Sequence, residues 1–323
     1  MEEDYTRIML KQKLNFFDIF KQALTIPCTS KKFIVFSFFT SLPFFCFLVF
    51  FEIILQGLFL ETSKFLELRP HYSYYYYDLG KYERLATNFV PKLIQLCLLY
   101  LIPYQLLEFL IVIVIVPLAS MIYTAEKPVS FRDMMVRKTR LKGPFITSIY
   151  VHLLSTTILI GLAGFLTNCC LMVRSFDYHA YFDILLTIVR GVGCTALLVK
   201  LLEWSAGWNM ALVISILEEK YGIEALEWAA YINRDCRQRG LILMLVFFAW
   251  GLTVRLSCIF YEYSDELATG SVLFTSIYTC LICLGNVMKW VICVVYFFDC
   301  KKGISEKKVD DEEVGRDVKL VNV

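Results

Sequence analysis

Residues 33–60 read FIVFSFFTSLPFFCFLVFFEIILQGLFL, and this stretch decides the fold. A helix needs roughly 20 apolar residues to cross a hydrocarbon core of about 30 Å, so the stretch is long enough to span a bilayer. Five further apolar stretches reach the same length, at residues 93–122, 145–172, 185–216, 241–260 and 270–298. The sequence therefore predicts an all-α polytopic membrane protein with six transmembrane helices.

The composition agrees with a membrane protein. Hydrophobic residues make up 58% of the chain and the mean hydropathy is +0.60, whereas a soluble domain is nearer half apolar. The net charge of +2 is too small to indicate a nucleic-acid partner. We therefore expect the lipid bilayer as the main partner.

Basic residues are sorted between the two sides of a six-span arrangement. The N-terminal segment, the second and fourth loops and the C-terminal tail together carry 22 Lys and Arg residues, and the other three loops carry 6. Basic loops stay in the cytosol. This asymmetry predicts that both termini are cytosolic, in an endomembrane such as the endoplasmic reticulum or in the plasma membrane.

The chain divides by composition into three parts. Residues 1–32 form a cytosolic segment, residues 33–298 form the six-helix transmembrane domain, and residues 299–323 mix Lys with Asp and Glu. The last part has no apolar periodicity, which predicts a disordered cytosolic tail.

The first outer loop, residues 61–92, contains the run Tyr74–Tyr77. It is expected to lie on the outer leaflet, and a tyrosine-rich binding surface is the alternative.

Three short segments carry apolar residues at helical spacing beside the predicted cytosolic ends of the spans: residues 15–24, 130–136 and 222–238. In the last of these, Ala225, Ala229, Ile232 and Cys236 lie on one stripe with Trp228. The periodicity is typical of a helix lying in the headgroup plane. The same stripe could instead pack against the ends of the spans.

Each of the three segments precedes two spans, so the chain could consist of three repeats of one amphipathic helix and two spans. The alternative is that there is no repeat, because the chain of any six-span protein enters the membrane from the cytosol three times.

The first segment, residues 15–24, has its own apolar side. Phe16, Phe20, Ala23 and Leu24 are expected to share one face, away from Asp18.

Ionisable residues inside the spans are the best candidates for a polar site, because each costs about 2.5–3.5 kcal/mol at the centre of a bilayer. The candidate residues are Glu108, Lys200, Glu203 and Lys289. Lys200 and Glu203 are three residues apart on one helix face and can pair. Lys289 is the expected partner of Glu108 in another helix.

Three other charged residues lie toward the outer ends of their spans, namely Glu52, Arg190 and Arg255. Their side chains are expected to reach the headgroups.

Two interpretations of the charged residues remain open. A transporter would use Glu108 as a proton or substrate site in a helix that Pro103 and Pro117 interrupt. The alternative is structural ion pairing inside a bundle, which we favour.

No residue pattern indicates catalysis. The chain contains 3 His residues, none of which is spaced with another His, Cys or acid as a metal-ligand set, and no nucleotide-binding or hydrolase motif is present. We expect neither an enzyme nor a cofactor. Cys300, followed by two lysines at the membrane edge, is a candidate for lipidation by palmitate.

Residues 203–226 carry a recognisable pattern. It consists of Glu203-Trp204, Trp208, the element Val213-x-Ser215-x-Leu217-Glu218, and then Gly222. The pattern resembles a family of plant multi-pass membrane proteins in which a Trp-containing span ends in such an element before an amphipathic segment. The resemblance implies a six-helix fold and a plant source, and it implies no activity.

Together these features favour a non-enzymatic membrane protein that acts as a scaffold or regulatory component, with protein partners bound through the cytosolic amphipathic helices. A small-solute or ion transporter is the alternative.

Overall fold

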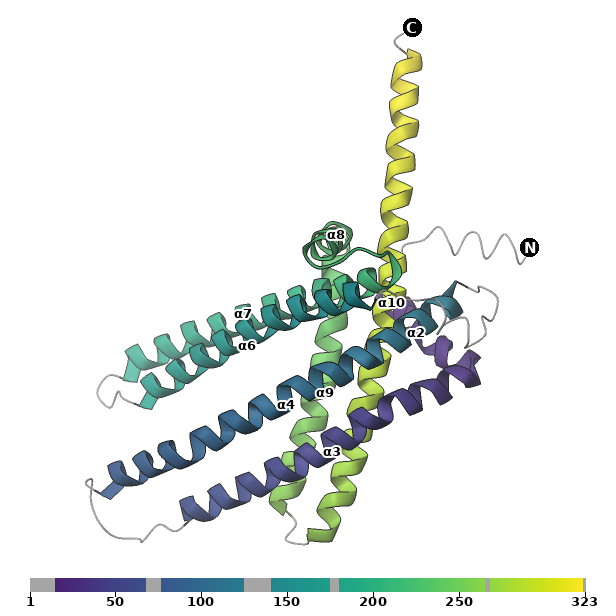
Figure 1. The fold of residues 1–323 in the computed structure, drawn as a ribbon. Helices are drawn as coiled ribbons and strands as arrows, with labels where there is room; N and C mark the ends of the chain where they lie inside the picture. Colours follow the sequence, from purple (N-terminus) through teal and green to yellow (C-terminus); the bar gives the residue numbers. More distant parts are fainter. Residues whose placement is uncertain (1–14, 68–76, 125–140, 175–179, 265–267, 322–323) are drawn as a thin grey trace. The chain divides into compact units, whose positions relative to one another are not determined.

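The computed structural model describes residues 15–67, 77–124, 141–174, 180–264 and 268–321. Over these residues the protein is all-helical, which confirms the expected fold class (Figure 1). The helices are α2 (Phe16–Thr29), α3 (Lys31–Glu67), α4 (Tyr77–Tyr123), α6 (Lys142–Arg174), α7 (Ala180–Leu217), α8 (Ile223–Asn233), α9 (Arg237–Ser264) and α10 (Ala268–Val321).

Six helices in the described part of the chain are long and apolar enough to cross a membrane. Their candidate spans are Lys31–Gly57, Leu98–Tyr123, Lys142–Leu162, Ile188–Leu217, Arg237–Arg255 and Val272–Glu306. Large apolar side chains on these helices remain uncovered by protein, including Phe39 at 65% and Leu273 at 69% exposed. Soluble proteins rarely leave so much contiguous apolar surface in water, so hydrocarbon must cover it.

Two segments outside the spans are more helical than the sequence predicts. Most of the loop expected at residues 61–92 is helix, because α3 continues to Glu67 and α4 begins at Tyr77. Residues 68–76 lie outside the described part, so the tyrosine-rich surface stays a prediction.

The tail expected to be disordered instead continues α10 as far as Val321. Its Lys and Glu residues are good helix formers. They also pair at helical spacing, as Lys302 does with Glu306 at 3.8 Å.

The helices contribute to two compact units, of which the first comprises residues 1–33, 115–250 and 288–323. Its core lies in α7 and α10, where residues 210–214 and 290–297 are each at most 4% exposed. A helix that is apolar all round belongs in such an interior. α6 and α8 both pack on α7. The ring of Tyr123, at the end of α4, stacks on Phe298 at 5.3 Å.

The second unit comprises residues 34–114 and 251–287. Arg255 of α9 pairs with Glu52 of α3 at 3.4 Å and donates to the hydroxyl of Tyr278 in α10 at 3.1 Å. The sequence did not predict this pair, and the expectation that Glu52 and Arg255 reach the headgroups stays a prediction. Two opposite charges on neighbouring helices neutralise one another at less cost than either would incur alone in the membrane. Tyr100 of α4 packs on Phe51 of α3 with ring centroids 4.2 Å apart.

Candidate functional site around helix α8

A tight turn joins α7 to α8 and ties both helices to α6. The backbone N–H of Gly222 donates to Oγ1 of Thr147 in α6 at 2.8 Å. Gly222 has φ +60° and ψ −125°, a conformation that side-chain-bearing residues rarely adopt. Glu219 also has a positive φ, of 56°. The turn thus depends on one glycine and on one buried hydroxyl group.

Helix α8 is amphipathic, as the sequence predicts, but it is shorter than residues 222–238. It ends at Asn233, and Arg237 already begins α9. The apolar stripe faces protein, because Ala225, Ala229 and Ile232 are at most 1% exposed and α8 packs on α7. Of the two accounts of this stripe, packing against the ends of the spans is the correct one.

Trp228 is held by polar contacts at the edge of this packing. Its indole N–H donates to Oε2 of Glu218 at 2.8 Å, and the ammonium of Lys220 lies 3.6 Å from its ring centroid. The other oxygen of Glu218 accepts from Lys301 of α10 at 2.6 Å. These contacts connect α8 to the end of α7 and to α10, and they fix the position of Trp228.

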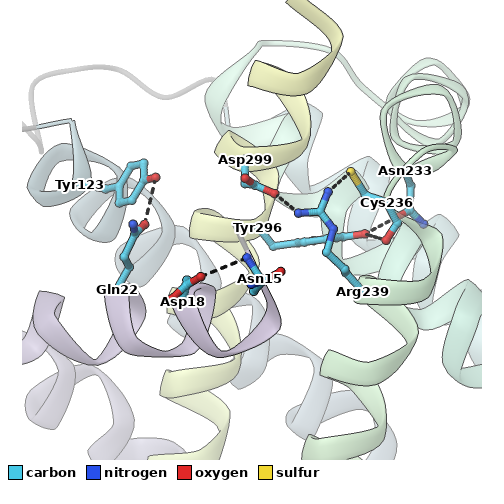
Figure 2. A network of polar contacts seen from close by, with 9 residues as sticks. All are labelled: Asn15, Asp18, Gln22, Tyr123, Asn233, Cys236, Arg239, Tyr296 and Asp299. Atoms are coloured by element: carbon cyan, nitrogen blue, oxygen red, sulfur yellow. Dashed lines mark hydrogen bonds and ion pairs between the residues drawn. The ribbon is translucent and has the colours of Figure 1, made fainter. Parts of the chain in front are cut away.

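A network of polar side chains lies between α8, α9 and α10 (Figure 2). The hydroxyl of Tyr296 donates to Oδ1 of Asn233 and lies 2.9 Å from the carbonyl oxygen of Cys236. A Cβ atom on Gly240 would lie 2.6 Å from the Tyr296 hydroxyl oxygen. Glycine at this position therefore lets α9 approach the Tyr296 hydroxyl closely.

Arg239 and Asp299 form the ionic part of the same network. One guanidinium nitrogen of Arg239 pairs with Oδ2 of Asp299, and another donates to the sulfur of Cys236 at 2.9 Å (Figure 2). The Asp299 side chain is 4% exposed. Burying a carboxylate demands an ion pair with further hydrogen bonds, and Arg239 supplies the cation.

The two thiols beside Arg239 are both buried. A hydrogen bond from the Cys300 thiol, aided by the charge of Arg239, lowers the pKa of Cys236 to about 7 despite its burial. Cys300 itself is 1% exposed. Lipidation of Cys300 stays a prediction, and the burial of its side chain within α10 means that an acyl donor could reach the sulfur only after a local opening of this packing. A residue near the membrane edge can still direct its side chain into the protein, and the sequence alone does not show the orientation of the Cys300 side chain.

The predicted pair of Lys200 and Glu203 is present, with 3.0 Å between Nζ and Oε2. Arg237, at the start of α9, pairs with the other carboxylate oxygen of Glu203. The Glu203 side chain is only 10% exposed, whereas both cations are more than half exposed. Two cations therefore compensate one buried carboxylate, and the sequence identified only one of them.

A groove of about 460 Å³ opens beside this ion pair. We call it the α8 groove, and residues of α6, α7, α8 and α9 line it: Leu154, Glu203, Trp204, Gly207, Trp208, Leu226, Ala230, Asn233, Arg234 and Arg237. The indole rings of Trp204 and Trp208 are 6.4 Å apart. The groove thus combines two indole rings with one carboxylate and two arginines.

Helix α2 confirms the predicted N-terminal amphipathic segment, and its capping box between Asn15 and Asp18 explains where it starts. The face buried in protein consists of Ile19, Ala23 and Ile26. Of the residues expected to share an apolar face at the headgroups, Phe20 and Leu24 do lie on the outer side, whereas Ala23 is buried. Because both sides of α2 are apolar, the sequence does not show which side packs on the protein.

The outward side of α2 is a second apolar surface. Phe17 is 79% exposed, and a shallow hollow of about 360 Å³ is lined by Phe17, Phe20, Lys21, Leu24, Thr25 and Cys28. Such a helix, with one face in the protein and one apolar face outside, suits the membrane interface.

The remaining expectations about the sites stay predictions. Glu108 belongs to the second unit and Lys289 to the first, and their pairing is untested. The ammonium of Lys289 lies 4.6 Å from the ring centroid of Trp290. The segment at residues 130–136 lies outside the described residues, so the threefold repeat is untested as well.

Over the part of the chain that the structure describes, no cluster of His, Cys, Asp and Glu could hold a metal ion. The polar side chains around α8 are arranged to hold helices together and to line a groove.

A family model described as Domain of unknown function (DUF8558) matches residues 5–316, and the chain belongs to that family. No curated protein and no solved structure matches the chain.

Proposed function

We propose that this family member is a non-enzymatic integral membrane protein that acts as a scaffold or regulatory component. One observation supports the proposal most directly. The buried charges around α8 are compensated within the protein, Asp299 by Arg239 and Glu203 by Lys200 and Arg237. Charges arranged in this way stabilise a fixed assembly of helices, whereas a transport pathway needs polar groups that exchange partners with a solute.

The binding surface of this component would be the outer face of α8. Its side chains at Glu224, Glu227 and Tyr231 are exposed, while the opposite stripe is buried against protein. We propose that protein partners bind this acidic face and that it lies in the cytosol together with both termini. The 22-to-6 distribution of basic residues supports that orientation.

We further propose an endomembrane, such as the endoplasmic reticulum, or the plasma membrane of a plant cell as the location. The support is the likeness of residues 203–226 to plant multi-pass membrane proteins. Protease treatment of sealed microsomes tests the orientation. A C-terminal tag should be cleaved with the membrane intact, and a protected tag would contradict it.

Proximity labelling from the C-terminus tests the scaffold role. A reproducible set of neighbours should be labelled with the wild type and should be lost in the charge-reversal variant Glu224→Lys/Glu227→Lys. Lys142→Gln, an exposed substitution at the start of α6, is the matched control and should keep the set. An unchanged set in the double variant would contradict a role for the α8 face.

A small-solute or ion transporter is the second candidate function. The observation that favours it is the location of Glu108 and Lys289 inside candidate spans, where ionisable residues commonly mark transport pathways. Flux into proteoliposomes that disappears in Glu108→Gln would establish transport and overturn the scaffold proposal. Absence of flux for a panel of ions and small solutes supports the scaffold.

A further inference from the structure

The α8 groove carries a charge that its own residues do not balance. Lys200, Arg237 and Arg234 lie in or beside it, and Glu203 is the one carboxylate among its lining residues. The backbone N–H of Arg234 bonds to Tyr231 at 3.4 Å, and within the described residues its guanidinium has no carboxylate partner. The Arg237 side chain is 56% exposed even while it binds Glu203. The mouth of the groove is therefore cationic.

The walls of the groove are apolar and continue onto surface that the bilayer must cover. Leu154 is 41% and Trp204 is 46% exposed, and both belong to candidate spans. Tryptophan in such a position prefers the level of the headgroups. A ligand that fits must therefore present an anionic group to the arginines and a hydrocarbon chain to the tryptophans.

We propose that the α8 groove binds the headgroup of an anionic phospholipid, with the phosphate at Arg234 and Arg237 and an acyl chain along Trp204 and Leu154. The volume of about 460 Å³ is in the usual range for small-molecule sites of roughly 300–1,000 Å³. Arginine suits this task because its planar guanidinium can bind two phosphate oxygens at once. The proposal does not depend on the scaffold role of the protein.

A lipid fits better than a soluble anion or a peptide, for a reason of position. A soluble anion would leave the exposed indole of Trp204 unused. A peptide would have to compete with hydrocarbon for the surfaces of α6 and α7. A phospholipid already has both parts in the geometry that the groove requires.

Quenching of tryptophan fluorescence by brominated lipids tests the proposal directly. The full-length protein is reconstituted in phosphatidylcholine vesicles that contain an equal mole fraction of either dibrominated phosphatidic acid or dibrominated phosphatidylcholine. Phosphatidic acid should quench more strongly. Trp204→Phe/Trp208→Phe should abolish this preference while Trp250, which is 43% exposed on α9, still reports ordinary bilayer lipid.

Arg234→Gln removes the cation without disturbing the Glu203 ion pair. A basic residue near an anionic lipid contributes about fivefold in affinity, so the relative affinity for phosphatidic acid should fall about fivefold. Lys142→Gln, which removes a basic residue outside the groove, should leave the preference unchanged. Unfolding temperatures of both variants in detergent check that each protein is folded.

Three results would overturn the proposal. These are equal quenching by the two brominated lipids in the wild type, an unchanged preference in folded Arg234→Gln, and loss of the preference when millimolar glycerol 3-phosphate is added. The last result would assign the groove to a soluble phosphate compound and not to a lipid.

Discussion

The hydroxyl of Tyr296 in α10 donates a hydrogen bond to Oδ1 of Asn233, the last residue of α8. The same hydroxyl lies 2.9 Å from the carbonyl oxygen of Cys236, just before α9 begins. Both Tyr296 and Asn233 are buried. The hydroxyl proton of Tyr296 therefore serves two acceptors in the turn between α8 and α9, and it holds this turn against α10.

Tyr296→Phe should destabilise the protein measurably. The substitution keeps the ring but leaves two buried acceptors without their donor, which costs about 1–3 kcal/mol. The unfolding temperature in detergent should fall by several degrees. Tyr231→Phe is the matched control, because that ring stacks on Trp228 and is 48% exposed. Equal stability of the two variants would mean that the hydroxyl of Tyr296 contributes nothing.

The turn between α7 and α8 should be sensitive to two different changes. Thr147→Val keeps the shape of the side chain but removes the acceptor of the Gly222 N–H, at a cost of about 1–3 kcal/mol. Gly222→Ala forces a side chain into a positive-φ conformation, which costs of order 1–3 kcal/mol. Thermal unfolding measures both. Thr147→Ser retains the hydroxyl and should behave nearly as the wild type, and a loss as large as that of the valine variant would rule out the hydrogen bond as the cause.

Thiol labelling should distinguish Cys28 from Cys300. Cys28 is exposed on the outward side of α2, whereas Cys300 is 1% exposed. In versions of the protein that retain only one of these cysteines, a membrane-permeant maleimide should modify Cys28 in the folded protein and should modify Cys300 only after denaturation. Rapid modification of Cys300 in the folded protein would contradict its burial and would support it as a lipidation site.

The stability of the protein should also depend on pH through Cys236. Its pKa is lowered from an ordinary value of 9 to about 7, so the folded state favours the thiolate. For a group with a depressed pKa, the stabilisation is fully present above the unfolded pKa and is lost as the pH falls through the folded pKa. The difference in unfolding temperature between the wild type and Cys236→Ser should therefore increase from pH 7 to pH 9. A constant difference would show that the thiolate does not form.

The spans could be predicted from the sequence because their signal is local. A long apolar run such as residues 33–60 needs no knowledge of its neighbours, and α3 indeed contains it. The pair of Lys200 and Glu203 could be predicted for the same reason, since three residues along a helix decide the contact.

The contacts that connect separate helices could not be predicted in this way. Arg237 reaches Glu203 across 34 positions of sequence, and Arg239 reaches Asp299 across 60. Asp299 could have been recognised as a candidate ion-pair residue, because it is an acidic residue at the end of an apolar run. Nothing in the sequence identified Arg239 as its partner. The same limit applies to α2, because both of its faces are apolar and the sequence does not indicate which of them packs on protein.

The ion pairs of Glu203 give a final prediction. Lys200→Gln alone should cost less than about 1 kcal/mol, because the lysine is more than half exposed and exposed pairs contribute little. Arg237 still compensates the carboxylate in that variant. The double variant Lys200→Gln/Arg237→Gln should cost more than the sum of its single changes, about 3 kcal/mol or more, because it leaves a 10%-exposed carboxylate without a cation. Unfolding temperatures in detergent measure the coupling.

A third substitution separates loss of charge balance from loss of packing. Adding Glu203→Gln to the double variant removes the uncompensated charge and keeps the size of the side chain. Much of the lost stability should then return, because an amide in this position is far cheaper to bury than a carboxylate. If the triple variant is no more stable than the double one, the cations stabilise α7 and α9 through contacts of their alkyl chains, and the charge of Glu203 plays no part.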